Sequence, residues 1–214
     1  MVQIIPAVLS TKEENFQEDI NKIADSTLTA GGWVHIDFMD KVFVPNESIR
    51  PSVTAKYPIN LKKEAHLMVA HPLDWLDELV KAGFERIIFH IEAKDDTLEC
   101  IRKIREKGLR VGIAVNHETS LEKLEPFIDQ IDLVLLMAIK PGFQGQPFIE
   151  ESLEKIQILK AKNWPVAIGV DGAVRDANAK QLIKSGVDHL VVGSYLLKGD
   201  FDENFEKLWE AIQG

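Results

Sequence analysis

Short apolar runs alternate with amphipathic segments along the whole sequence. The runs are rich in β-branched and aliphatic residues, which is typical of strands, whereas the segments between them repeat apolar positions at helical spacing. Strands and helices that alternate in this way predict a parallel sheet with helical crossovers. We expect strands in 3–10, 33–39, 61–69, 86–92, 110–116, 132–139, 165–171 and 189–194, and helices in 16–25, 73–83, 95–108, 120–128, 150–162, 177–186 and 203–213.

Eight strand and helix units are enough to close a barrel. A chain of 214 residues is at the short end of what one α/β barrel needs. No Gly/Ser-rich or charged linker interrupts the pattern, so we expect one catalytic domain over residues 1–214. The alternative architecture is an open doubly wound sheet. Such a sheet typically has a GxGxxG turn after an early strand, and the sequence has none. The prediction is therefore an α/β fold, a single (β/α)8 TIM barrel.

Charge and composition narrow the possible partners. The net charge of −9 argues against nucleic acid and anionic membranes as partners, because both select clustered Lys and Arg. No apolar run approaches the roughly 18 residues of a membrane helix, and the N-terminal segment lacks the features of a signal peptide. We expect a cytoplasmic protein. The lone Cys100 excludes an intramolecular disulfide, and we interpret it as a packing residue.

Two imidazoles and two carboxylates fall at the ends of expected strands. Strand alternation places His35 and Asp37 on one face of 33–39, His66 near the end of 61–69, and Asp171 at the end of 165–171. Barrel enzymes carry their chemistry at these carboxyl ends. Such a ligand set suits a divalent transition metal with open positions for substrate. We expect one ion per chain (Zn, Fe(II), Mn or Co), with Zn favoured. The alternative is that each histidine is an isolated core or capping residue.

The three methionines other than Met1 also fall at the carboxyl ends of expected strands. They are Met39, Met68 and Met137. Core packing is the usual role of Met, but a polarizable side chain also suits the lining of a reacting centre.

Three segments rich in small residues suggest a site for a phosphate group. They are KPGFQGQPF, DGAV and VGSY, at 140–148, 171–174 and 192–195, after the sixth, seventh and eighth expected strands. Small residues let backbone N–H groups approach an anion, and the last two segments match the usual phosphate position in barrels. Ordinary turn geometry is the alternative for each segment alone.

These motifs together resemble the ribulose-phosphate 3-epimerase family over nearly the whole chain. PAVLS, VHIDFMDKVFVPN, HLMV, LLMAIKPGFQGQPF, VDGAV and VVGS occur in that order. The resemblance implies a metal held by His35, Asp37, His66 and Asp171, with Ser10 and His66 contacting substrate. It also implies a lining of Met39, Met68 and Met137, and substrate contacts at Gly142, Phe143, Gln144, Gly145, Gly172, Ala173, Gly193 and Ser194.

The chain departs from the family pattern at four positions. Gln144 and Ala173 stand where the family usually has glycine, and each adds a side chain beside the phosphate. Where the backbone needs a positive φ, such a replacement costs on the order of 1 kcal/mol. Lys140 replaces a residue that is usually Asn or acidic, and Gly169 stands where Glu is frequent. These changes leave open whether a pentulose or a hexulose phosphate is preferred.

The expected reaction is epimerisation at C3 of a ketose phosphate, D-ribulose 5-phosphate to D-xylulose 5-phosphate. Asp37 and Asp171 would exchange a proton on opposite faces of a metal-stabilised enediolate. No organic cofactor is needed, because the metal stabilises the carbanion. We also expect a homo-oligomer. Of the remaining histidines, His71, His90, His117 and His189, we expect structural or surface roles, and His90 is best placed to support a metal ligand.

Three other functions stay open. The first is a 3-epimerase acting on a hexulose phosphate such as allulose 6-phosphate. The second is a phosphoketose lyase or decarboxylase, which uses Asp-x-Lys-x-x-Asp on the third strand where this chain has KKEAHLMV. The third is a barrel that binds sugar phosphate without turnover, which the two aspartates argue against.

Overall fold

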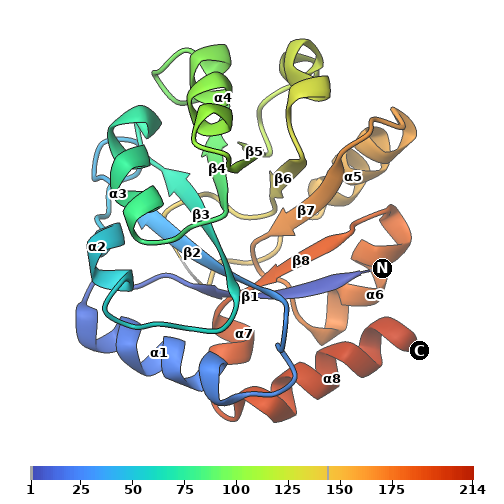
Figure 1. Ribbon diagram of the computed structural model, residues 1–214. Helices are drawn as coiled ribbons and strands as arrows, with labels where there is room; N and C mark the ends of the chain where they lie inside the picture. The colour runs from blue at the N-terminus through green and yellow to red at the C-terminus, as the bar shows by residue number, and fades with distance from the viewer. Residues whose placement is uncertain (1, 144) are drawn as a thin grey trace.

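A computed structural model describes residues 2–143 and 145–214 of the chain. Within this part, parallel strands pair in chain order and β8 pairs with β1, which closes the barrel (Figure 1). The predicted (β/α)8 barrel is confirmed. The strands are β1 Gln3–Val8, β2 Trp33–Met39, β3 Lys62–Met68, β4 Arg86–His90, β5 Arg110–Val115, β6 Leu133–Met137, β7 Ala167–Asp171 and β8 His189–Val192.

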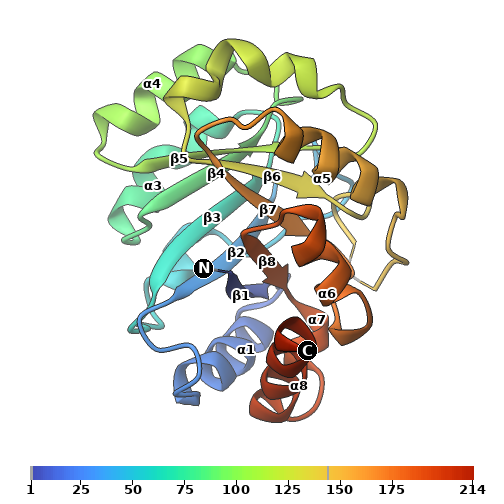
Figure 2. The same ribbon diagram turned by 90° about the vertical axis from the view of Figure 1, so that its right-hand side faces the viewer.

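Helices surround the strands as an outer layer, which forms a ring around the barrel in Figure 1 and is seen from the side in Figure 2. Their apolar faces pack on the outside of the barrel. They are α1 Glu13–Asp25, α2 Pro51–Thr54, η1 Pro72–Trp75, α3 Leu76–Lys81, α4 Thr97–Glu106, η2 Leu121–Gln130, α5 Glu151–Ala161, α6 Asp176–Ser185, α7 Ser194–Leu197 and α8 Phe201–Gln213. None of the described helices is both long enough and apolar enough to cross a membrane.

Two expected helices differ in detail from the structure. The segment expected at 73–83 is divided into the 3₁₀ turn η1 and the short helix α3. The segment expected at 120–128 is the 3₁₀ helix η2, which contains Pro126. Proline has no N–H to donate and its ring clashes with the preceding turn of an α-helix, so a regular α-helix is disfavoured there.

The core has two layers because each strand is covered on both faces. One apolar layer lies between strands and helices, and it includes Cys100 of α4, which is fully buried as expected for a packing residue. Burial raises the pKa of this thiol to about 12. The second layer fills the inside of the barrel with side chains such as Ile5, Trp33, Ile88 and Leu135. Inward positions of β2, β3 and β7 above this layer are polar, and they build the site.

Candidate active site

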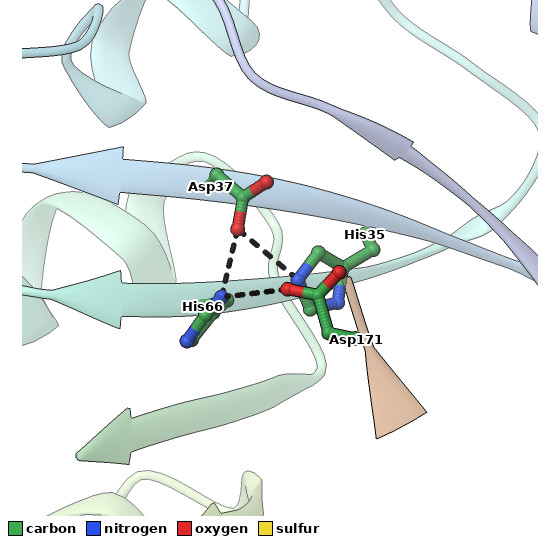
Figure 3. Close-up of side chains that lie close together, drawn as sticks. All are labelled: His35, Asp37, His66 and Asp171. Carbon is green, nitrogen blue, oxygen red and sulfur yellow. Dashed lines mark hydrogen bonds and ion pairs between the residues drawn. The ribbon is translucent and has the colours of Figure 1, made fainter. Parts of the chain in front are cut away.

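The four expected metal ligands converge at the carboxyl ends of β2, β3 and β7. Asp37 is paired in register with His66 across β2 and β3, and Asp171 ends β7. One nitrogen or oxygen atom from each of the four residues lies within 4.8 Å of the others. Figure 3 shows both carboxylates turned toward the imidazoles. His66 Nδ1 lies 2.7 Å from Asp37 Oδ1 and 3.7 Å from Asp171 Oδ2.

His35 is oriented from below by a buried ion pair. Its Nδ1 lies 2.6 Å from Glu64 Oε1, and Glu64 Oε2 accepts from Nε of Arg86 at 2.7 Å. The three residues are neighbours because the register pairs His35 with Glu64 and Glu64 with Arg86. All three side chains are buried. Since a carboxylate can only accept, Nδ1 of His35 donates, and its Nε2 faces Asp37 Oδ1 at 3.3 Å.

The carboxylates of this cluster favour a positive charge between them. Burial lowers the pKa of His35, but the Asp37 and Glu64 carboxylates outweigh it and raise the pKa to about 10. Burial likewise raises the pKa of Asp37, yet His35 and His66 hold it well below its ordinary value. Burial, and then the charge of Asp37, raise the pKa of Asp171 to about 6. Two buried carboxylates, Asp37 and Glu64, and the partly buried Asp171 surround two histidines whose nitrogens face oxygens, and this set fits a divalent transition metal.

A pocket of about 400 Å³ opens above the cluster at the mouth of the barrel. Asp37 and Asp171 both line it, although they come from strands separated in the ring by β1 and β8. The other expected substrate contacts in its wall are Met68, Met137, Gly142, Phe143, Gly145, Gly172, Ala173, Gly193 and Ser194.

The other expected contacts lie behind this wall or outside the described residues. Met39 is buried and packs behind Met68. Ser10 is buried, and its hydroxyl has no hydrogen-bond partner among the described residues. His66 lies below the wall, fully buried. The expected contact at Gln144 falls outside the described part of the chain.

Left-handed backbone brings the loops close to the pocket. Gly142 has φ +97°, and a Cβ there would lie 2.9 Å from Val44. Asn46 donates to the carbonyl oxygen of Gly142 at 2.7 Å, so the loop after β2 holds the loop after β6. Gly172 has φ +117°, and a Cβ there would lie 2.8 Å from the backbone nitrogen of Ile139. Ala173 has φ +52° although it carries a side chain.

Comparison with known proteins agrees with this geometry. The model of the ribulose-phosphate 3 epimerase family matches residues 3–197. A ribulose-phosphate 3-epimerase of Chlamydia muridarum is 38% identical over 183 residues, covering 82% of this chain and 80% of that protein. One from Bacillus subtilis is 35% identical over 201 residues, covering 91% of each.

The chain belongs to the ribulose-phosphate 3-epimerase family. Membership in this family makes it an enzyme of the isomerase class, an epimerase. A solved 3-hexulose-6-phosphate synthase from Salmonella typhimurium superposes with a TM-score of 0.71 at 15% identity, covering 99% of both chains. At this identity the likeness concerns the barrel alone.

Sequence reasoning missed several residues of this epimerase site. Glu64 lies two positions before His66 on the inward face of β3, so a carboxylate in the E-x-H pattern was the available signal. Glu92, just after β4, contacts His90 but stands in a loop with no motif of its own. The pocket mouth is also lined by side chains outside the small-residue pattern, namely Arg175, Tyr195, Lys198 and Asn204.

Proposed function

We propose that the protein interconverts D-ribulose 5-phosphate and D-xylulose 5-phosphate by inverting C3, with Asp37 and Asp171 as the two proton-transferring groups. The observation that carries the proposal is that these carboxylates, from β2 and β7, line one pocket together with the loops after β6, β7 and β8. Inversion requires an acid and a base on opposite faces of the reacting carbon. Phosphate at the loops would place a sugar chain across both carboxylates.

The two carboxyl groups have opposite proton affinities, which suits the two roles. His35 and His66 hold the pKa of Asp37 well below its ordinary value, so in the metal-free site this group is ionised and carries no proton. Burial and the charge of Asp37 bring the pKa of Asp171 to about 6, so it can hold a proton near neutral pH. Two neighbouring carboxyls with separated pKa values are typical of acid and base pairs. The roles are exchanged when the reaction runs in the other direction.

The remaining residues bind and orient. A divalent cation, Zn in preference to Fe(II), Mn or Co, held by His35, Asp37, His66 and Asp171 would supply a Lewis acid for the substrate's carbonyl oxygen. The hydroxyl of Ser10, buried behind the pocket wall and without a hydrogen-bond partner among the described residues, is the group that we propose contacts a substrate oxygen. Backbone N–H groups near Gly142, Gly145 and Gly193 would bind the phosphate, with Phe143 closing the pocket.

A pentulose phosphate is the favoured substrate class. The pocket is small for a ligand site, and the methyl group of Ala173 occupies part of the wall beside the phosphate loops. A lyase is disfavoured, because the inward positions of β3 near the pocket hold His66 and Met68, and the lysine on this face, Lys62, is exposed at the opposite end of the strand. We further propose that residues 1–214 act as one catalytic domain in a cytoplasmic homo-oligomer.

Steady-state kinetics after metal analysis tests the function. We expect about one divalent ion per chain, loss of turnover on chelation, and a higher kcat/KM for ribulose 5-phosphate than for allulose 6-phosphate. His66→Ala should weaken metal binding more than about 100-fold, beyond what a change behind a ligand produces. His71→Ala is the control, since His71 is an exposed histidine outside the cluster. Full turnover of metal-free protein would refute the metal site, and higher kcat/KM for the hexulose would refute the substrate.

A further inference from the structure

His90 lies directly behind His66 and is not needed for proton transfer. It ends β4 and is fully buried. Its ring stacks on that of His66 with centroids 5.1 Å apart, and Phe43 covers it with centroids 4.8 Å apart. Its Nε2 lies 3.0 Å from Nε2 of His66, and its Nδ1 lies 3.1 Å from Oε2 of Glu92. One line of contacts therefore runs from Glu92 through both rings to the metal cluster.

The directions of these hydrogen bonds follow from what each group can donate. An ionised carboxylate only accepts, so Nδ1 of His90 carries the proton shared with Glu92. Nε2 of a neutral His90 is then an acceptor, and Nε2 of His66 must donate to it. The remaining nitrogen of His66, Nδ1, is left with its lone pair, 2.7 Å from Asp37 Oδ1. That nitrogen is the one that faces both aspartates.

We propose that His90 and Glu92 are positioning residues that fix the tautomer of His66, so that its Nδ1 is the atom available to a metal. This inference rests on the proposed metal site. It assigns opposite nitrogens to the two histidine ligands. Glu64 engages Nδ1 of His35 and leaves Nε2 for the site, whereas His90 engages Nε2 of His66 and leaves Nδ1.

Glu92 is itself held firmly enough to set this direction. Its Oε1 accepts from the backbone N–H of Asn116 at 3.0 Å, and the Thr119 side chain also bonds to it. The turn that carries both residues is fastened by Lys155 of α5, whose Nζ donates to the carbonyl oxygens of Asn116 at 2.8 Å and of His117 at 2.9 Å. The carboxylate therefore has little freedom to turn away from His90.

We call the hydrogen bonds from Glu92 through His90 to His66 the relay. Zinc affinity, measured by competition with a chromophoric chelator, tests the relay without relying on turnover. His90→Phe keeps an aromatic ring between His66 and Phe43 but removes the acceptor. Glu92→Leu removes the acceptor for His90, whereas Glu92→Gln keeps one oxygen that can accept from Nδ1 of His90 and replaces the second acceptor oxygen with an amide NH2. Groups behind metal ligands typically change affinity 10- to 100-fold, so His90→Phe and Glu92→Leu should each weaken zinc binding by about that factor. Glu92→Gln should weaken zinc binding less than Glu92→Leu, because its amide oxygen can still accept from Nδ1 of His90.

The control is His71→Phe, since His71 is an exposed histidine that also bonds to a carboxylate, that of Asp95. Circular dichroism of each metal-free variant checks folding. If His90→Phe does not fold, the comparison of Glu92→Leu with Glu92→Gln tests the proposal. Unchanged zinc affinity in His90→Phe, or equal losses in Glu92→Gln and Glu92→Leu, would overturn the relay while leaving the metal site standing. A wild-type protein that binds no zinc would overturn the metal site and the relay together.

Discussion

The two halves of the barrel mouth are built differently. The strand half consists of β2, β3 and β4, where His35, Asp37, His66 and His90 occupy regular inward positions and each bonds to another side chain. The loop half consists of the segments after β6, β7 and β8. There the backbone itself faces the pocket, and several residues have positive φ.

This difference matches what each half must do. Proton transfer and metal binding need side-chain atoms held to fractions of an ångström, and strand positions closed in by register partners supply that precision. Phosphate binding needs backbone N–H groups near an anion, and left-handed turns with small residues supply that access. Changes in the strand half should therefore act mainly on chemistry and folding, and changes in the loop half mainly on binding.

The largest expected effect is at Asp171, which ends a strand but opens into the loop half. Asp171→Asn should lower kcat for net epimerisation by at least about 100-fold, because general acid–base groups contribute 10²- to 10⁴-fold. With Asp37 intact, one epimer should still exchange its C3 proton with deuterated solvent. Asp37→Asn should leave exchange in the other epimer only. The measurement is mass spectrometry of each recovered epimer after incubation in D₂O.

Both aspartates are also expected metal ligands, so these exchange experiments need saturating metal and confirmed occupancy. Lost exchange in an empty site would report only on metal binding. Should metal-loaded Asp171→Asn exchange both epimers and interconvert them near the wild-type rate, the paired-aspartate assignment would be wrong.

The next effect concerns folding of the strand half. Burial raises the pKa of Glu64, but His35 and Arg86 outweigh it and lower the pKa from 4.5 to about 2. A carboxyl with a lowered pKa stabilises the fold above its unfolded pKa, so this contribution is complete above pH 4.5 and is lost as pH falls through about 2. A lowering of this size corresponds to about 3 kcal/mol.

Glu64→Gln should therefore cost about 3 kcal/mol at neutral pH, since it leaves Arg86 charged and buried without its partner. Urea unfolding of metal-free protein at several pH values measures this, and stability should fall less in the variant than in wild type below pH 4.5, because the Glu64 contribution is missing. Asp77→Asn is the control, because its pair with Lys107 is exposed and should contribute nothing measurable. Equal stabilities of wild type and Glu64→Gln would contradict the buried ion pair.

The comparison also explains what could be predicted from sequence. A strand repeats every two residues, so alternation alone was enough to place His35 and Asp37 on the inward face, and barrel closure brought His66 and Asp171 to them. The eight strands were predictable because each is a short run rich in β-branched and aliphatic residues. A positive φ at Ala173 was anticipated only as a condition, because it depends on the turn that follows β7.

Partners set by register were not predictable. Glu64 meets His35 only because β2 and β3 are paired at one particular offset, and a single sequence does not encode that offset locally. Glu92 reaches His90 from a loop, where no period applies. The apolar spacing of 120–128 predicts a helix, but spacing does not carry the loss of the N–H at Pro126, and η2 is a 3₁₀ helix.

The smallest expected effect lies in the loop half, at Ala173. An L-residue at φ +52° is strained by roughly 1 kcal/mol relative to glycine, so Ala173→Gly should raise the free energy of unfolding by up to about 1 kcal/mol. Ala177→Gly is the matched control, since Ala177 lies in the first turn of α6, where glycine should lower stability by about 0.5 kcal/mol. In kinetics, Ala173→Gly should change KM more than kcat, because the phosphate lies away from the reacting carbon. If the same Ala→Gly change raises the free energy of unfolding at 173 and lowers it at 177, the backbone conformation at each position determines the effect. Equal losses of stability in both variants, or a change confined to kcat, would contradict the contrast between the two halves.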